Sequence, residues 1–301
     1  MLNLPDNVCN WFNSFFNQRS HCTVYNGDRS SNLEITASIV QGSAVGPASY
    51  VVTAADLHPI TPGNEMCKYA DDTYIIIPAS NTDSRAAELR NVETWACANN
   101  LKLNYNKTTE IIFYNRRSQR TFQKPTEIAG IARVTSIKVL GVTITGSLSM
   151  SSHVQNVLSS CSQTLYALRT LRAHGLSTPA LQTIFCSVIL AKITYAASAW
   201  CGFITQTDKR RIDSFIKRSK RAGLCADDIA DFDKLCQACD CKLFNAITSN
   251  NNHVLFSLLP NKSIASECYN LRSRLHDLEL PDRLNRLTDS NFLYRVLYSI
   301  L

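Results

Sequence analysis

Two adjacent aspartates, Asp71 and Asp72, are the side chains of this sequence best placed to do chemistry. They follow Tyr69-Ala70 and precede the apolar run Ile75–Ile77. Two apolar stretches around a short polar tip predict a tight β-hairpin with the acids at that tip. Carboxylates held together in this way can bind divalent metal ions, and pairs of such ions drive phosphoryl and nucleotidyl transfer.

Asp-Asp pairs also occur in ordinary turns, because aspartate tolerates tight backbone conformations. The flanking strands of this pair look buried, however, and acids are a costly choice there unless they face a cleft or a metal ion. We therefore interpret Asp71 and Asp72 as candidate metal ligands, with a plain solvated turn as the alternative.

Charge is unevenly distributed along the 301 residues, which are 45% hydrophobic and carry a net charge of +7. Residues 1–110 hold 7 Lys and Arg against 11 Asp and Glu, whereas residues 111–301 hold 24 against 13. A basic second half beside an acidic first half suits a protein that grips a polyanion with one part and does metal chemistry with the other. A solvated basic surface is the alternative.

The twelve cysteines follow no regular spacing, and no basic segment followed by an apolar one opens the sequence. We therefore expect no secretory signal, an intracellular location and reduced thiols. The most apolar stretch, Leu181–Ile204, contains Lys192 and several polar residues. We expect it to be a buried helix rather than a membrane span, and we expect no membrane partner.

Strands and helices alternate around the candidate acids up to about residue 148. Asn26-Gly27 predicts a hairpin, Asp83 begins a helix that runs to Asn99, and Val134–Thr145 reads as a strand pair bent at Gly141. We expect an α+β domain over residues 1–148, in which helices pack on an antiparallel sheet.

Residues 149–301 read as helices only, and the change in composition near residues 146–152 predicts a domain boundary. Apolar spacing predicts helices over 153–174, from Thr178-Pro179 to about Trp200, from Thr207-Asp208 onward, over 231–248 and over 292–301.

Four motifs follow one another in a characteristic order and spacing. They are Gln41-Gly42-Ser43-x-x-Gly46-Pro47, Lys68-Tyr69-Ala70-Asp71-Asp72-Thr73, Asn100–Asn104 with Lys107-Thr108, and Leu140–Ile144. Together they resemble the reverse transcriptase of a non-LTR (LINE-type) retrotransposon, and jockey-like elements most. The resemblance continues through later segments such as Tyr195–Phe203, so it covers nearly the whole chain.

The resemblance implies a partial right-hand polymerase palm over residues 1–148, followed by an all-helical, thumb-like and C-terminal region over residues 149–301. It implies RNA-directed DNA polymerase activity by two-metal nucleotidyl transfer in the intact protein. The implied partners are an RNA template, a DNA primer and dNTPs, and the implied cofactor is Mg²⁺, which suits oxygen ligands and substrate phosphates.

The resemblance also implies catalytic roles for three residues. Asp71 matches the metal-ligating aspartate of the catalytic hairpin, and Asp72 supports the same metal site. Lys107 matches a lysine proposed to protonate the leaving pyrophosphate. The alternative for Lys107 is an ordinary solvated lysine.

Substrate-binding roles are implied in the same way. Gln41, Gly42 and Ser43 would line the floor where the incoming nucleotide pairs with the template, and glycine there lets the backbone approach the substrate closely. Tyr69 would lie near the primer terminus. Leu140 and Gly141 match the hairpin that holds the primer strand.

A basic run in the second half is a candidate contact to the nucleic-acid backbone. It consists of Lys209, Arg210, Arg211, Lys217, Arg218, Lys220 and Arg221. Because Ile212, Phe215 and Ile216 give this helix an apolar face, we expect the charges to lie outward. In a helical thumb they would bind nucleic acid in a salt-sensitive, sequence-independent way; a merely soluble surface is the alternative.

The sequence departs from the family in one respect. A complete palm has another catalytic aspartate on an earlier strand, and neither Asp6, Asp28 nor Glu34 fits that position. We therefore expect the chain by itself to be inactive, as a truncated or decayed reading frame or a fragment of a longer gene. A non-catalytic nucleic-acid-binding protein that keeps the basic thumb is the alternative, and an enzyme completed by another chain is a further one.

A zinc site is not expected. Cys236-x-x-Cys239-x-Cys241, with His253 further on, has the residue types of a zinc knuckle. These cysteines fall in a predicted helix, however, where residues five apart point in different directions. We interpret them as core or surface thiols.

Overall fold

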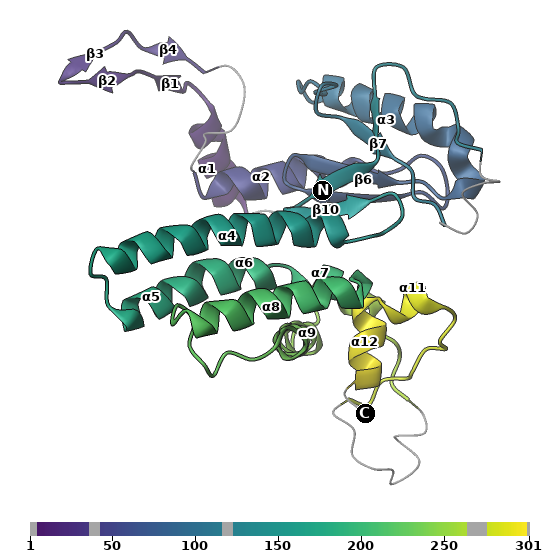
Figure 1. Ribbon diagram of the computed structural model, residues 1–301. Coiled ribbons are helices and arrows are strands. Elements are labelled where there is room, and N and C mark those ends of the chain that lie inside the picture. The colour runs from purple at the N-terminus through teal and green to yellow at the C-terminus, as the bar shows by residue number, and fades with distance from the viewer. Residues whose placement is uncertain (1–4, 36–42, 116–122, 264–275, 300–301) are drawn as a thin grey trace. The chain divides into compact units, whose positions relative to one another are not determined.

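The computed structural model describes residues 5–35, 43–115, 123–263 and 276–299. By compactness the chain divides into unit 1, residues 1–109 with 125–132, and unit 2, residues 110–124 with 133–301. Figure 1 labels their elements. The domain boundary that the sequence predicts near residue 148 stays a prediction.

Unit 1 begins with helix α1 (Asp6–Phe16) and two small strand pairs. Strand β1 (Ser20–His21) pairs with β4 (Leu33–Glu34), and β2 (Val24–Tyr25) pairs with β3 (Asp28–Arg29). The turn of the inner pair is Asn26-Gly27, and both residues have the positive φ that a two-residue hairpin turn requires. The predicted hairpin is therefore confirmed.

The rest of unit 1 surrounds a second hairpin. Its elements are α2 (Val45–Thr53), the 3-10 helix η1 (Ala54–Asp56), strands β5 (Glu65–Tyr69) and β6 (Asp72–Ile76), the 3-10 helix η2 (Ala79–Ser84) and α3 (Arg85–Ala98).

Glu88 on α3 is 1% exposed and ties α3 to the segment that precedes β5. It accepts hydrogen bonds from the backbone N–H groups of Ile60 and Thr61 and from the Asn64 amide, at 3.1, 2.8 and 2.8 Å. Burial pushes the pKa of Glu88 up, but these hydrogen bonds outweigh it and leave the pKa lowered. The carboxylate therefore remains charged inside unit 1.

Unit 2 opens with short strands. Strand β7 (Thr109–Ile111) pairs with β8 (Ala132–Val134), and β9 (Ser136–Val139) forms a hairpin with β10 (Val142–Thr145). Glu110 and Arg133 support the first pair with an ion pair of 2.6 Å.

The mixture of helices and small sheets agrees with the predicted α+β class, but one antiparallel sheet with packed helices does not form. The described residues contain five separate two-stranded sheets instead. The described strands have only two to five residues each, and each pairs with a single partner strand, so the pairs do not join edge to edge.

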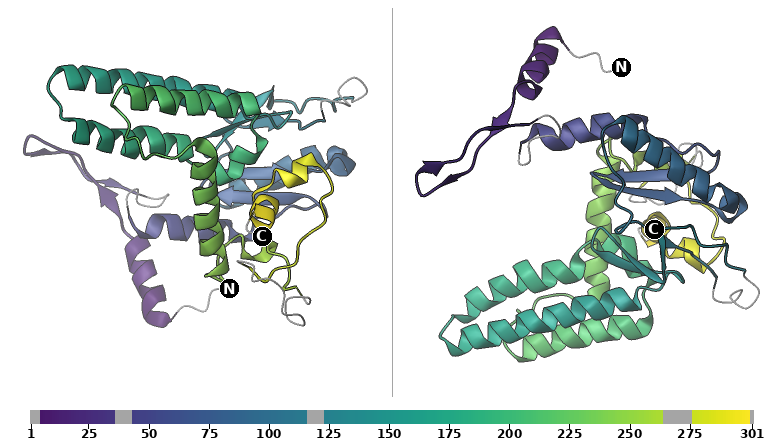
Figure 2. Two further views of the ribbon diagram at one scale, coloured as in Figure 1. Left: turned by 60° about the horizontal axis from the view of Figure 1, so that its bottom comes forward. Right: turned by 90° about the horizontal axis from the view of Figure 1, so that it is seen from above.

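Helices make up the rest of unit 2. They are α4 (Ser151–Ala173), α5 (Thr178–Ile184), the π-helical η4 (Phe185–Leu190), α6 (Ala191–Thr194), α7 (Ala197–Trp200), the 3-10 helix η5 (Cys201–Phe203), α8 (Gln206–Arg221), α9 (Phe232–Thr248), the 3-10 helix η6 (Phe256–Leu258), α11 (Arg286–Asp289) and α12 (Phe292–Ser299). The long helices α4 and α8 lie side by side, and α9 runs across them (Figure 2). One isolated bridge joins Lys262 to Leu278.

The single helix predicted from Thr178 to Trp200 is wrong in one respect, because the structure interrupts it. The helix changes to π-helical geometry at Phe185, and it breaks at Ala196, whose φ is 50°. The indole N–H of Trp200 donates to the carbonyl oxygen of Tyr195 at 2.9 Å across this break. Apolar spacing does not reveal this break, because the hydrogen bond across it joins a side chain to the backbone.

The same stretch forms the centre of the unit 2 core. By length and composition alone, Thr178–Phe203 could cross a membrane. In this fold, however, Leu181, Phe185, Ile189 and Ile193 are completely buried. They pack with residues of α4, α8 and α9 in one hydrophobic cluster, which is the arrangement expected of a core helix. The absence of a membrane partner stays a prediction.

Candidate catalytic hairpin and basic helix

The two candidate acids lie at the tip of the hairpin formed by β5 and β6 in unit 1. In its register Tyr69 is opposite Asp72, so Ala70 and Asp71 are the two residues of the turn. Ala70 has a left-handed φ of 50°, which turns of this kind use although it is unfavourable for a residue with a Cβ atom. The predicted hairpin with acids at its tip is confirmed.

This hairpin has one open face and one packed face. Directly opposed residues share a face, so Tyr69 and Asp72 lie together on the open one, and both are exposed. Met66 and Ile75, also opposed, are half-buried on the other face. Asp71 is exposed in the turn. The tip therefore exposes both carboxylates to solvent, and the hairpin that carries them is packed on one face.

Lys68 anchors the packed face of this hairpin. Its Nζ donates hydrogen bonds to the carbonyl oxygens of Ala54 and Leu57, at 2.5 and 2.8 Å. Both carbonyls lie at the 3-10 turn that follows α2. The sequence motif contains Lys68 but does not reveal its role, which is to fix β5 against that turn.

Tyr50 on α2 is a residue of this site that the sequence motifs did not identify. Burial raises the pKa of its phenol, and the negative charge of Asp71 raises it further. The folded chain therefore brings a protonated phenol within electrostatic range of the hairpin tip. The only signal in the sequence is its place in the apolar helix that follows Gly46-Pro47, because the proximity to Asp71 is a tertiary property.

The two carboxylates at the tip could supply some of the ligands of a hard cation such as Mg²⁺. Asp71 and Asp72 supply the oxygen ligands that Mg²⁺ prefers, and Mg²⁺ commonly keeps water and substrate phosphates as its other ligands. Within the described ranges, no group of three or more His, Cys, Asp and Glu side chains is placed to hold a metal ion. These residues therefore fit a portion of a metal site.

The other predicted catalytic and nucleotide-binding residues are more scattered. Gln41 and Gly42 lie outside the described residues. The Ser43 hydroxyl accepts a hydrogen bond from the N–H of Gly46 at 3.1 Å, at the start of α2. Lys107 is exposed in a turn, and in the part of the chain that the structure describes no hydrogen bond or ion pair joins it to the hairpin.

Leu140 and Gly141, the predicted primer-holding residues, form the turn between β9 and β10. Both have positive φ, of 45° and 91°. Tyr195 supports the turn from the helix break, because its hydroxyl donates to the carbonyl oxygen of Leu140 at 3.1 Å. The turn therefore has an aromatic brace that the sequence motif does not include.

Replacing Gly141 with alanine is expected to destabilise unit 2 by about 1–3 kcal/mol. An alanine at this position would keep the positive φ that is unfavourable for a residue with a Cβ atom, and its Cβ would lie 3.1 Å from Cε1 of Tyr195. Gly175→Ala is the matched control, because Gly175 has a φ of 92° and a Cβ there would meet nothing within 4 Å. Urea unfolding followed by circular dichroism measures both losses. Equal losses of stability in Gly141→Ala and Gly175→Ala would mean that the Tyr195 ring moves aside at no cost in free energy and does not brace the turn.

The basic run lies on α8, whose residues Ile212, Phe215 and Ile216 are buried as predicted. Four of its seven cations have partners in the structure. Lys209 pairs with Asp233, Arg211 pairs with Asp208, Lys220 donates to the carbonyls of Asp227 and Ile229, and Arg218 donates through Nε to the carbonyl of Ser214. Arg210, Lys217 and Arg221 are exposed, and no ion pair to them occurs within the described residues.

The cysteines of the knuckle-like spacing lie on α9, as predicted from the sequence. Cys236 is buried, whereas Cys239 and Cys241 are half-buried. Cys236 shares a hydrogen bond with the buried thiol of Cys201, and this bond together with burial raises the pKa of Cys236 far above its usual range. Cys236 is therefore a protonated core thiol.

Comparison with known proteins identifies one matching family and two similar proteins. Residues 1–144 match the family of reverse transcriptases (RNA-dependent DNA polymerases). The RNA-directed DNA polymerase from mobile element jockey of Drosophila melanogaster is 29% identical over 158 residues, which are 48% of this chain and 17% of that protein. The probable RNA-directed DNA polymerase from transposon BS of the same species is 26% identical over 202 residues, which are 62% of this chain and 22% of that protein.

Proposed function

We propose that this chain, whose residues 1–144 are a reverse transcriptase domain of the jockey-like, non-LTR retrotransposon kind, supplies part of the palm and the thumb of an RNA-directed DNA polymerase. The palm part would be residues 1–148 and the thumb-like and C-terminal part residues 149–301. Its partners would be an RNA template, a DNA primer and dNTPs, which places the protein inside the cell.

The observation that carries this proposal is the β5–β6 hairpin. Two exposed aspartates lie at its tip, Lys68 fixes its packed face, and Tyr69 lies beside Asp72 on its open face. In the proposed function Asp71 is the metal ligand, Asp72 supports it, and Tyr69 lies near the primer terminus. Mg²⁺, when bound, would activate the primer hydroxyl and stabilise the leaving oxygens.

Other residues would bind the substrates in the intact polymerase. Ser43, with Gln41 and Gly42, would line the floor under the incoming nucleotide. The Tyr195-braced turn at Leu140 and Gly141 would hold the primer strand. Lys107 would donate a proton to the leaving pyrophosphate. This role is supported by the exposure of Lys107, because its side chain forms no ion pair within the described residues that would have to break before it reaches the pyrophosphate.

Primer extension tests the catalytic half of the proposal. We expect the purified 301-residue chain alone to show no Mg²⁺-dependent extension, because within the described residues no third His, Cys, Asp or Glu side chain joins Asp71 and Asp72 in a metal-binding group. Extension should appear when a polypeptide that supplies a further catalytic aspartate is added, and Asp71→Asn should abolish it. Extension by the chain alone would refute the expected inactivity, and activity that survives Asp71→Asn would refute the assignment of the metal ligand.

A non-catalytic nucleic-acid-binding protein is the second candidate, and a separate observation favours it. Arg210, Lys217 and Arg221 leave positive charge exposed on α8, and such charge binds phosphates without sequence preference. Binding that is independent of Mg²⁺, together with no extension after a further catalytic aspartate has been supplied, would select this candidate over the polymerase.

A further inference from the structure

Helices α4 and α8 of unit 2 form a parallel pair that is joined at both ends. At their first turns, the Ser151 hydroxyl donates to the Asp208 carboxylate at 2.7 Å. At their last turns, Arg172 donates to the carbonyl oxygen of Ala222 at 2.5 Å. Figure 1 shows the two helices side by side. The pair is thus held at a set spacing, and a shallow groove follows the seam between its helices.

This groove has a volume of about 570 Å³ and an apolar floor with polar walls. Leu158 and Phe215 form the buried floor. Hydroxyl groups and guanidinium groups form most of the walls, and none of the residues that line the groove is acidic. A wall that combines cations with hydroxyl donors, without a competing carboxylate, suits an anion with several oxygen atoms.

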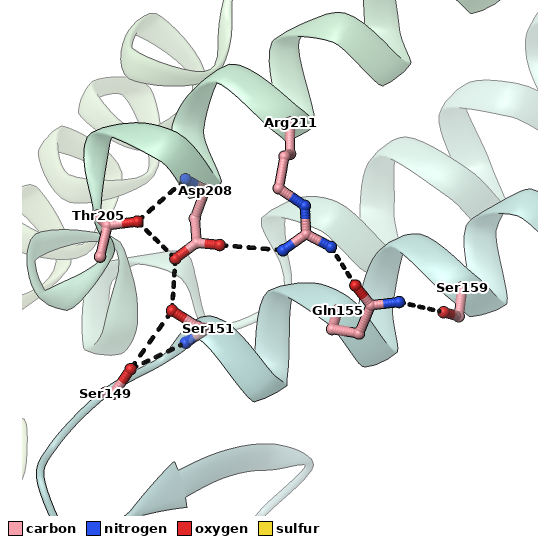
Figure 3. A network of polar contacts seen from close by, with 7 residues as sticks. All are labelled: Ser149, Ser151, Gln155, Ser159, Thr205, Asp208 and Arg211. Carbon is pink, nitrogen blue, oxygen red and sulfur yellow. Dashed lines mark hydrogen bonds and ion pairs between the residues drawn. The ribbon is translucent and has the colours of Figure 1, made fainter.

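Arg211 occupies the groove but is already neutralised there. Figure 3 shows its guanidinium between two partners: Asp208, which accepts a hydrogen bond at 3.1 Å, and Gln155 of α4. Asp208 is 3% exposed and also accepts a hydrogen bond from Thr205 at 2.8 Å. Burial alone would raise the pKa of Asp208, but these hydrogen bonds and the charge of Arg211 leave it lowered. Arg211 is therefore a strut between the helices.

Arg210 and Arg218 differ from Arg211, because their charges have no acidic partner among the described residues. They are eight positions apart on α8, which separates them by about 12 Å along the helix axis. Both line the groove together with Ser159 and Ser162 of α4. A ligand that contacts both arginines must therefore be extended and must carry anionic groups at intervals.

We infer that the groove between α4 and α8 binds the phosphodiester backbone of a nucleic acid. Arg210 and Arg218 contact separate phosphates, the hydroxyl of Ser159 donates to a phosphate oxygen from α4, and Arg211 sets the width of the groove without neutralising a phosphate. The inference rests on the proposed nucleic-acid function and deepens it, because it divides the basic residues of one helix into ligands and a strut.

The dependence of binding on salt tests this division. For duplex DNA, the logarithm of the association constant falls with the logarithm of salt concentration, with a slope of about −0.9 for each phosphate neutralised. The full chain would be titrated against fluorescein-labelled duplex DNA of mixed sequence by fluorescence anisotropy over a series of KCl concentrations. We expect Arg210→Gln and Arg218→Gln each to reduce the slope by about 0.9.

Three variants are expected to keep the wild-type slope. Lys242→Gln removes the same charge from an exposed position on α9 that does not line the groove. Arg211→Gln removes the strut, so it should lower the melting temperature while leaving the slope unchanged. Gln155→Leu repeats the strut test without a change of charge on α8, and it should also lower the melting temperature at constant slope.

The outcomes separate the inference from the function on which it rests. Salt-dependent binding that keeps its wild-type slope in both Arg210→Gln and Arg218→Gln would overturn the groove and leave the nucleic-acid function standing. A reduced slope in Arg211→Gln would make Arg211 a phosphate ligand and overturn the strut. A wild-type chain that does not bind duplex DNA at the lowest salt concentration would refute the proposed nucleic-acid function itself.

Discussion

Alanine at Trp200 is expected to lower the free energy of unfolding of unit 2 by about 3–5 kcal/mol, the range for removing a large aromatic side chain from a core. Trp200 is 1% exposed. Its ring stacks on Phe232 of α9, with ring centroids 5.6 Å apart, and meets the edge of His153 of α4 at 4.9 Å. The variant thus removes contacts to two helices at once and leaves a cavity between them.

The same variant should also loosen the β9–β10 turn. The indole of Trp200 holds the carbonyl of Tyr195, and the hydroxyl of Tyr195 holds the carbonyl of Leu140. Urea unfolding measures the loss of stability, and hydrogen exchange at Leu140 and Gly141 measures the loosening. Trp200→Phe is the comparison variant, because it keeps an aromatic ring for stacking but loses the N–H donor and part of the ring area. If Trp200→Ala unfolds at the wild-type urea concentration, the core does not depend on this residue.

Removing either member of the Asp240–Arg295 ion pair is expected to cost unit 2 about 3–5 kcal/mol, because the other member remains as an unpaired and mostly buried charge. The guanidinium of Arg295 on α12 contacts both carboxylate oxygens of Asp240 on α9, at 3.1 and 2.8 Å. It also donates to the backbone carbonyls of Ser198 and Ser290. The pair therefore attaches α12 to α9 and to α7.

Asp240→Ala and Asp233→Ala form a matched comparison on one helix. Asp233 also pairs with a cation, Lys209, but its side chain is 66% exposed, so its loss should cost at most about 1 kcal/mol. The double variant Asp240→Leu with Arg295→Met removes both charges and should recover most of the stability lost in Asp240→Ala. Thermal and urea unfolding check all three variants. Equal losses at Asp233 and Asp240 would contradict the argument from burial.

Local backbone chemistry made the turns and helix starts predictable from the sequence. Asn26-Gly27 and Leu140-Gly141 are turns with positive φ, as glycine at the second position allows. Asp231 caps α9 through its side chain, which accepts from the N–H of Lys234. The hairpin of Asp71 and Asp72 belongs to the same class, because a short polar tip between two apolar strands specifies its own pairing.

Tertiary contacts could not be predicted in this way. The helix predicted from Thr178 to Trp200 breaks at Ala196, and beyond the break Trp200 stacks on Phe232 of α9; apolar spacing contains no information about such partners. The separation of the small sheets could not be predicted for the same reason. A turn specifies which two strands pair, whereas the whole fold decides whether the outer edge of such a pair meets another strand.

By itself, the sequence determined the resemblance of residues 1–144 to reverse transcriptases, the hairpin that presents two carboxylates and the helix that carries the basic run, because each depends on residues that are close together along the chain. Only the tertiary structure decided that Tyr50 lies within range of Asp71, that Lys68 anchors the hairpin and that Tyr195 braces the turn at Gly141. It also decided which arginines of α8 have an acidic partner among the described residues, since the charge of Arg211 is neutralised by a buried Asp208, whose pKa is lowered by hydrogen bonds and by that charge. Motifs record which residues are present, whereas pairing, burial and electrostatics depend on distances that only the folded chain sets.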